Sequence, residues 1–175
     1  MNSLVFTFIG PDKPGLIEKV SSAVNQHGGN WLESRMSQLA GQFAGIVRVA
    51  ISDEQTAALS KALHELSDNS ELTIVLQPAS NTVATNDYRL LRLSVIGNDR
   101  PGIVREITRA LASRHINIVE MDTSVTSAPM SGDPLFEAML DIQLPKTQSI
   151  DELNDNLDAI ADELTIEISL EEVLR

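Results

Sequence analysis

Two short segments of this chain place an acid, a base, a proline and a glycine in the same order. The first is Gly10-Pro11-Asp12-Lys13-Pro14-Gly15, and the second is Gly97-Asn98-Asp99-Arg100-Pro101-Gly102. A Gly/Pro turn that opens into a helix presents backbone N–H groups at the positive end of the helix dipole, which suits a carboxylate. The acids Asp12 and Asp99 could accept a hydrogen bond from an ammonium group. This combination suits a free amino acid, although both acids could instead be helix caps or dipole partners.

An asparagine follows each segment at the same spacing. Asn30 follows Pro14 at the interval that separates Asn117 from Pro101, since 30 − 14 = 117 − 101. Each could supply an amide to the same ligand, or could be a left-handed turn residue. The repeat continues downstream, because Glu71-Leu72-Thr73-Ile74 recurs as Glu163-Leu164-Thr165-Ile166. The two copies are offset by 101 − 14 = 87 residues at the proline and by 163 − 71 = 92 residues at this later segment. The second copy therefore contains a net insertion of five residues, which we expect in a loop because loops tolerate insertions.

The elements that must position these segments follow the order βαββαβ in each copy. In the first copy, apolar patterning predicts strands at 4–10, 31–40, 43–52 and 72–76, and helices that start near Leu16 and at Asp53, the expected N-cap. In the second copy, strands are predicted at 90–97, 117–126, 135–144 and 165–170. One helix carries Ile103, Ile107 and Leu111, and the other begins with a capping box of Ser149 and Glu152.

This order predicts an α+β fold of two ferredoxin-like domains in tandem. Each would have a four-stranded antiparallel sheet with two helices on one face. The expected boundaries are 1–76 and 88–175, with residues 77–87 as a polar linker. The second face of each sheet is left open, so it must be covered by the sister domain, a second chain or a ligand, or else be polar.

The composition limits the classes of function. The 175 residues carry a net charge of −12 and no cysteine. The charge argues against direct nucleic-acid binding, which depends on neutralising phosphates, and the lack of cysteine excludes disulfides and thiolate metal sites. The first apolar run stops at Gly10 without a basic flank, so we expect no signal peptide, no membrane association and a cytoplasmic location. Six arginines of the second half form a basic stripe, either a solvated face or a docking surface for an acidic partner: Arg89, Arg92, Arg100, Arg105, Arg109 and Arg114.

The repeated Asp-Lys/Arg-Pro-Gly-Leu/Ile motif, followed by its asparagine, resembles the ACT domain, a small-molecule sensor module. The resemblance covers nearly the whole chain in two copies. Tandem ACT domains that begin with Gly-Pro-Asp-Lys/Arg-Pro-Gly are most similar to the glycine cleavage system transcriptional repressor family. That resemblance implies a repressor that holds a DNA-binding activator in check until glycine relieves it, with a homodimer as one arrangement.

The resemblance also implies which residues bind the ligand. They belong to the two loops and the two later asparagines: Gly10, Asp12, Lys13, Gly15, Asn30, Gly97, Asp99, Arg100, Gly102 and Asn117. ACT domains that bind serine commonly have Asn at the loop position held here by Asp12 and Asp99, so the acid could alter the choice of ligand. We expect Trp31 to pack in the core or between domains.

Three other functions compete with this one. An enzyme is not expected, because the three histidines lie in separate elements and no nucleophile, phosphate-loop or metal-ligand pattern is present; no cofactor is predicted. RNA recognition uses the same element order but needs exposed aromatic residues on the central strands and a basic face. The last alternative is a tandem ACT regulator of a metabolic enzyme, which the sequence does not separate from the repressor.

Overall fold

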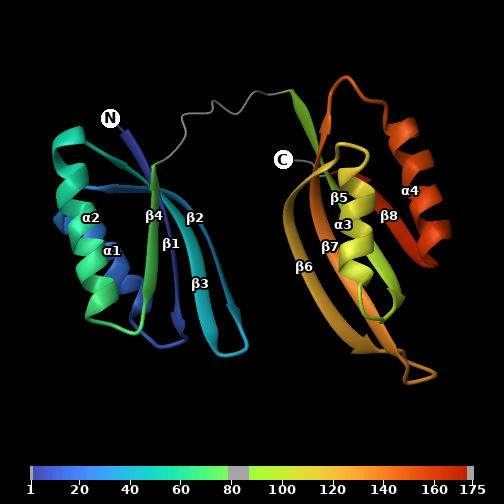
Figure 1. The fold of residues 1–175 in the computed structure, drawn as a ribbon, viewed down its shortest axis with the longest axis horizontal. Coiled ribbons are helices and arrows are strands. Elements are labelled where there is room, and N and C mark those ends of the chain that lie inside the picture. Colours follow the sequence, from blue (N-terminus) through green and yellow to red (C-terminus); the bar gives the residue numbers. More distant parts are fainter. Residues whose placement is uncertain (1, 79–86, 173–175) are drawn as a thin grey trace. The chain divides into compact units, whose positions relative to one another are not determined.

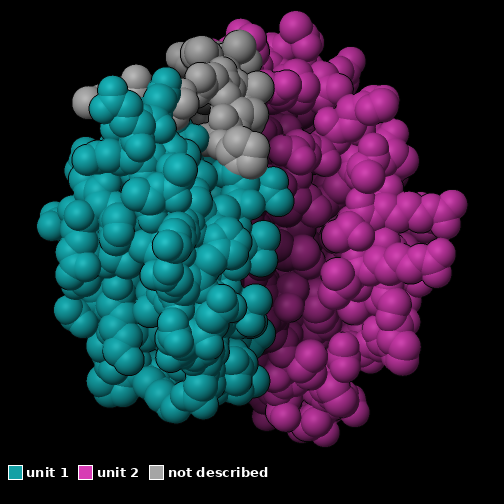
Figure 2. Space-filling model, turned by 60° about the vertical axis from the view of Figure 1, so that its left-hand side comes forward, with its two compact units in different colours: residues 1–83 teal, residues 84–175 magenta. Residues whose placement is uncertain are grey.

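Each half of the chain forms its own four-stranded antiparallel sheet, with two helices packed on one of its faces (Figure 1). The structure is a computed structural model that describes residues 2–78 and 87–172. It divides the chain into two compact units, residues 1–83 (unit 1) and 84–175 (unit 2), coloured separately in Figure 2. Most of the predicted linker, residues 79–86, lies outside the described residues. The predicted α+β fold is confirmed in both halves.

Unit 1 has the strand order β2-β3-β1-β4. Its elements are β1 (Asn2–Pro11), α1 (Leu16–Gln26), β2 (Asn30–Leu39), β3 (Gln42–Ile51), α2 (Asp53–Asp68) and β4 (Thr73–Pro78). Unit 2 has the equivalent order β6-β7-β5-β8. Its elements are β5 (Tyr88–Asn98), α3 (Ile103–Ala112), β6 (Asn117–Ser127), β7 (Pro134–Pro145), α4 (Ile150–Leu164) and β8 (Ile166–Glu172).

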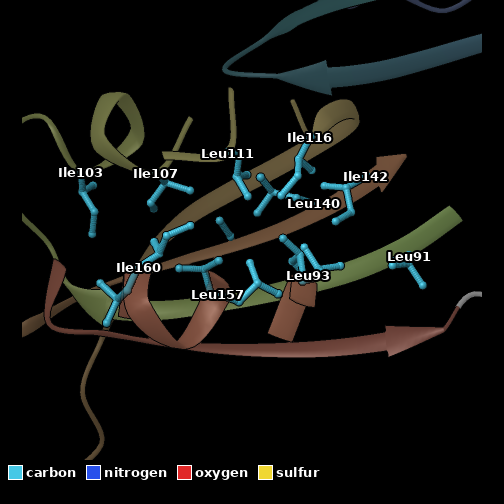
Figure 3. Close-up of a cluster of buried hydrophobic side chains, with 14 of the residues drawn as sticks. Leu91, Leu93, Ile103, Ile107, Leu111, Ile116, Leu140, Ile142, Leu157 and Ile160 are labelled. Carbon is cyan, nitrogen blue, oxygen red and sulfur yellow. The ribbon is translucent and has the colours of Figure 1, made fainter. Parts of the chain in front are cut away.

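Each unit buries a separate apolar core between its sheet and its helices. Alternate residues of the central strands point toward the helices, as the two-residue period of a strand requires. In unit 2, Ile103, Ile107 and Leu111 of α3 point toward residues of β5 and β7 such as Leu93 and Leu140 (Figure 3). This confirms the predicted apolar face of that helix.

The two hairpins differ as the insertion predicts. Strands β2 and β3 are joined by Ala40 and Gly41 alone, both with positive φ (51° and 78°), as a type I′ turn requires. Strands β6 and β7 are joined by a longer loop, closed by hydrogen bonds from Ala128 N to Asp133 O (2.8 Å) and from Gly132 N to Ala128 O (2.9 Å). The extra residues therefore extend one hairpin and leave the sheet unchanged.

The starts of the second helix in each unit follow the predicted pattern, with one correction. Helix α4 is capped by Ser149, whose hydroxyl accepts hydrogen bonds from the backbone N–H groups of Asp151 and Glu152. The predicted cap of α2, Asp53, is wrong by one residue. Ser52 is the N-cap with an extended backbone, and Asp53 lies in the first turn, where its charge still favours the helix dipole.

The first helix of each unit ends in the same motif with a different residue at its left-handed position. In unit 1, Gly28 has φ 72°, and Gly29 N donates to Val24 O (2.9 Å). In unit 2, His115 has φ 57°, and Ile116 N donates to Leu111 O (3.1 Å). These are Schellman-type helix ends, which favour glycine because a left-handed backbone crowds any Cβ. The second copy therefore carries a strained histidine where the first has glycine.

Replacing His115 by glycine should raise the free energy of unfolding of unit 2 by about 1 kcal/mol, since the left-handed strain disappears. The measurement is urea denaturation followed by circular dichroism. The matched change, Gly28→Ala, should destabilise unit 1, because it introduces a Cβ both at φ 72° and against Gln55. A loss of stability in His115→Gly would show that the imidazole makes a compensating contact.

Candidate functional site

The two repeated loops, residues 10–15 and 97–102, connect the central strand of each sheet to its first helix. Gly15 (φ 83°) and Gly102 (φ 91°) are the N-caps of α1 and α3, and no side chain caps either helix. Any other residue would be strained at these two angles. Without a capping side chain, N–H groups of the first turn face outward with the positive end of the dipole. Ser149 occupies the corresponding position of α4 and closes that helix end.

The two loop acids lie beside the helix starts but do not cap them. Asp12 and Asp99 are exposed, and each precedes the glycine N-cap by three positions. Their backbone N–H groups hold the loops to the adjacent hairpins, from Asp12 N to Gly41 O (2.9 Å) and from Asp99 N to Pro134 O (3.0 Å). The alternative that these acids are helix N-caps is therefore wrong. Their carboxylates remain at the surface of the loops.

The first glycine of each loop is required by close packing. A Cβ added to Gly10 would lie 2.9 Å from the backbone oxygen of Glu71, and one added to Gly97 would lie 2.6 Å from Ile166 Cγ2. Both glycines are near the end of the central strand, beside the residues that precede β4 in unit 1 and beside the first residue of β8 in unit 2. These two residues hold the loop against the sheet, so their role is to position the loop.

An open hollow of about 290 Å³ lies in front of the first loop. Its lining includes Asp12, Gly15 and the first helical residues, Ile17 and Glu18, together with Phe43 of β3. Our sequence reasoning did not identify Phe43. The strand register could have identified this residue. Gly10 pairs with Phe43 and Gly97 pairs with Phe136, so each loop has a phenylalanine opposite its first glycine.

The basic residues of the loops are engaged with acids. Lys13 forms an ion pair with Glu71, in the turn before β4. Arg100 donates to Glu106 Oε2 (2.5 Å) in the first turn of α3, and to the carbonyl oxygen of Leu164 (3.5 Å). Each base thus fastens its loop to a neighbouring element, and its charge is partly neutralised there.

The Arg100–Glu106 pair predicts a pH dependence of stability. The hydrogen bond from Arg100 holds the pKa of Glu106 below its ordinary value of 4.5. A carboxyl group with a lowered pKa in the folded state stabilises that state above the pKa it has when unfolded, and loses this effect as the pH falls through the folded pKa. The stability difference between the wild type and Glu106→Gln should therefore be largest near neutral pH and should shrink below pH 4.5. Urea denaturation of both proteins as a function of pH tests this; a pH-independent difference would contradict it.

The two asparagines are the first residues of β2 and β6. Strand β2 begins one residue earlier than predicted, and β6 begins at the predicted residue. Both asparagines lie far from the loops of their own units. Asn30 pairs with Ala50 on β3, whereas Gly10 pairs with Phe43, seven positions earlier on the same strand. In unit 2, Asn117 pairs with Gln143 and Gly97 pairs with Phe136, again seven positions apart. At about 3.4 Å per residue this is roughly 24 Å along the strand. One unit therefore does not bring its loop and its asparagine together.

Neither asparagine is a left-handed turn residue. Positive φ angles occur at Gly28 and at His115, two positions before each asparagine. Asn117 instead donates from Nδ2 to Gln143 Oε1 (3.2 Å) on β7. The turn alternative for the asparagines is therefore wrong, and their amides lie on the exposed end of each sheet.

The six arginines of the second half do not form one stripe. Arg92 is on β5, where it makes two hydrogen bonds to Asp141 (2.6 and 2.9 Å) on the sheet face away from the helices. Arg105 and Arg109 are exposed on α3, which packs on the opposite face. The sequence spacing suggested one surface because it does not reveal that a strand and the following helix lie on different layers.

The three phenylalanines on the central strands of unit 1, which RNA recognition would use, do not lie on the open face of that sheet. Phe6 and Phe8 are buried (0% and 2% exposed) on the helix-facing side of unit 1, and Phe43 packs against the same core. Phe6 also makes an edge-to-face contact with Trp31 (centroids 6.4 Å apart), which places that tryptophan in the core packing. The open face of unit 1 instead exposes the aliphatic residues Ile9, Ile46 and Val75 to about half. This arrangement offers no stack of aromatic rings to bases.

Two other kinds of feature do not occur in the described residues. In residues 2–78 and 87–172, no group of three or more His, Asp or Glu side chains is placed to hold a metal ion. None of the helices in this part of the chain has both the length and the apolar character needed to cross a bilayer.

Comparison with known proteins gives a consistent result for both halves. Residues 2–77 match one ACT-domain family profile, and residues 91–144 match a second ACT-domain profile. A UPF0237 protein of Methanococcus maripaludis is 30% identical over 80 residues, which are 45% of this chain and 82% of that protein. An unknown protein from Galdieria sulphuraria has 32% sequence identity and a TM-score of 0.84, with 99% of both chains covered. A candidate glycine cleavage system transcriptional repressor has a TM-score of 0.79 over 99% of this chain and 98% of its own, at 20% identity, so this likeness shows the fold.

Proposed function

This chain belongs to the ACT-domain family, with one ACT domain in each half and a UPF0237 protein among its relatives, and we propose that it is a regulatory protein that senses a free amino acid. One observation carries the proposal. Both loop-to-helix junctions have a left-handed glycine as N-cap, no capping side chain and an exposed acid three positions before it. Donors for a carboxylate and an acceptor for an ammonium group thus lie beside each other, twice.

The ligand we favour is glycine. Its carboxylate would accept hydrogen bonds from first-turn N–H groups of α1 or α3, and its ammonium group would donate to Asp12 or Asp99. The small size of glycine limits its affinity. At a ceiling of about −1.5 kcal/mol per non-hydrogen atom, its five such atoms give a binding free energy of at most roughly −7.5 kcal/mol, which is near micromolar affinity. A sensor with this site would respond in the micromolar to millimolar range.

We assign the two asparagines to the same sites in a homodimer. Since Asn30 and Asn117 lie seven positions along the sheet from the loops of their own units, an amide can complete a site only when another ACT domain presents it, and the source we propose is a second copy of the chain. Sedimentation velocity in the presence and absence of glycine tests this assignment. A strictly monomeric protein that still binds glycine would show that no second copy of the chain is needed to complete the site.

The regulated partner we propose is a DNA-binding activator of glycine cleavage genes. The protein would act by contact with that activator and not by binding DNA, since its net charge of −12 disfavours phosphate contacts. The likeness to a candidate glycine cleavage repressor supports this choice at the level of the fold. Affinity capture from cells grown with and without glycine tests it. Recovery of a metabolic enzyme in place of a transcription factor would favour the alternative of an enzyme regulator.

A thermal-shift screen of the twenty amino acids tests the sensing function itself. A ligand that binds only the native state raises the melting temperature, by an amount that grows with the logarithm of its concentration above Kd. We expect glycine to raise the melting temperature and large side chains to have little effect. A flat response to all twenty amino acids would contradict the proposal.

A further inference from the structure

A second hollow lies on the other side of Pro14, between the start of α1 and the turn before β4. It has a volume of about 60 Å³, which exceeds the roughly 10–15 Å³ that one water molecule needs by the same measure. Its apolar lining comes from Pro11, Pro14 and Leu16 on one side and Leu72 on the other. Asp12, Gly15 and Phe43, which line the hollow in front of the loop, are not part of it. The hollow therefore has room for a small aliphatic group. Its lining differs from that of the hollow in front of the loop.

Among the described residues, the polar groups around this hollow leave one cation without an ion-pair partner. Lys13 and Glu71 neutralise each other in an ion pair. Ser70 donates to Leu66 O (2.5 Å) and accepts from Leu72 N (3.3 Å), so its hydroxyl is engaged. Lys19 also lines the hollow, is exposed, and makes no ion pair in the described part of the chain. An apolar space beside one uncompensated ammonium group suits a monoanion with a short aliphatic body.

The second copy of the repeat reverses the charge at this place. With the offset of 87, Lys19 corresponds to Glu106, and with the offset of 92, Ser70 corresponds to Asp162. Glu106 accepts the hydrogen bond of Arg100, so the loop base of unit 2 is neutralised by the helix itself. The residues of unit 2 that correspond to the polar lining are one base, Arg100, and three acids, Glu106, Asp162 and Glu163, with a second base, Arg105, also close to Glu106. Unit 2 thus has more acids than bases where the lining of unit 1 has more bases than acids.

We propose that the hollow beside Pro14 in unit 1 binds a small aliphatic carboxylate monoanion, and that unit 2 has lost this property. The aliphatic end contacts Leu16 and Leu72, and the carboxylate accepts from Lys19. This site is distinct from the proposed amino-acid site, because the carboxylate is held by the side chain of Lys19 and not by the first-turn N–H groups of α1. The chain would then respond to two small molecules through the two sides of one loop.

A titration of the full chain with sodium propionate, followed by ¹H–¹⁵N NMR, tests the proposal. We expect saturable shifts of the backbone amides of Lys19, Ser70 and Leu72, and none at the unit 2 equivalents Glu106, Asp162 and Leu164. The variant Lys19→Glu, which installs the residue of the second copy, should raise the Kd for propionate at least tenfold. Lys61→Glu is the matched control, because Lys61 is another exposed lysine but lies on α2 away from the hollow.

Two further probes separate the chemistry. Propionamide has the same shape without the charge and should cause no saturable shift. Alanine adds an ammonium group to the propionate skeleton. It should bind less tightly, because Glu71, the carboxylate beside the hollow, is already paired with Lys13 and does not accept from that ammonium group. Equal propionate affinity in Lys19→Glu, saturation by propionamide, or tighter binding of alanine than of propionate would each overturn the proposal. Glycine binding at the other hollow is measured in the same samples and should be unchanged in Lys19→Glu, so failure of one site does not imply failure of the other.

Discussion

Replacing Asp12 and Asp99 together by alanine should strongly weaken glycine binding measured by calorimetry. Both carboxylates are exposed and neither caps a helix, so their removal costs the fold little. It does remove the acceptor proposed for the ligand ammonium group at each of the two loops. Hydrogen bonds to charged groups contribute about 1.5–3 kcal/mol, so each site should lose roughly tenfold to a hundredfold in affinity. A site of micromolar affinity would then bind glycine at about 10–100 µM, and a site that starts near millimolar affinity would give no detectable titration.

A charge-matched control keeps this result specific. Glu54→Ala with Asp158→Ala removes one exposed acid from α2 and one from α4, away from both loops. This control should bind glycine as the wild type does, and the circular dichroism spectra of all three proteins should coincide. Undiminished binding in Asp12→Ala with Asp99→Ala would remove the loop acids from the site.

Truncation of Phe6 to alanine should be among the most destabilising single changes in unit 1. Its side chain is fully buried on the central strand, and its ring packs edge-to-face against Trp31. A large-to-small change at such a site costs about 3–5 kcal/mol, since it removes buried area and leaves a cavity. Because the two units have separate cores, hydrogen exchange should accelerate throughout unit 1 while the strands of unit 2 keep their protection.

Val75→Ala is the contrasting variant on the same sheet. Val75 is on β4 with 49% of its surface exposed, on the face away from the helices. Its truncation should change the free energy of unfolding of unit 1 by less than about 1 kcal/mol. A loss comparable to that of Phe6→Ala would show that this face is buried in the native protein.

The fold could be predicted from the sequence because the chain is duplicated. Each copy gave an independent pattern of apolar and turn residues for the same set of strands and helices. Strand periods, the glycines of the loops and the apolar face of Ile103, Ile107 and Leu111 all lie where the pattern put them. The N-cap of α2 was predicted one residue too late, since Ser52 and Asp53 are both good N-caps and only the backbone angle distinguishes them.

The site was predicted only in part, because linear spacing does not give position along a sheet. The spacing from Pro14 to Asn30 is the same in both copies, yet a helix and a turn carry the chain back to the far end of the sheet. The ion pair between Lys13 and Glu71 joins residues far apart in sequence, and no local pattern indicates it. The reversal from Lys19 to Glu106 was visible in the aligned copies, but its meaning depended on the hollow that Lys19 lines.

The most direct test of the account is to locate bound glycine by ¹H–¹⁵N NMR on the intact wild-type chain. We expect saturable shifts at the first-turn amides of α1 and α3, namely Ile17 and Glu18 in unit 1 and Val104 and Arg105 in unit 2, because these N–H groups receive the carboxylate. Shifts that saturate elsewhere while these four amides stay unchanged would contradict the claim that the duplicated helix starts bind the amino acid.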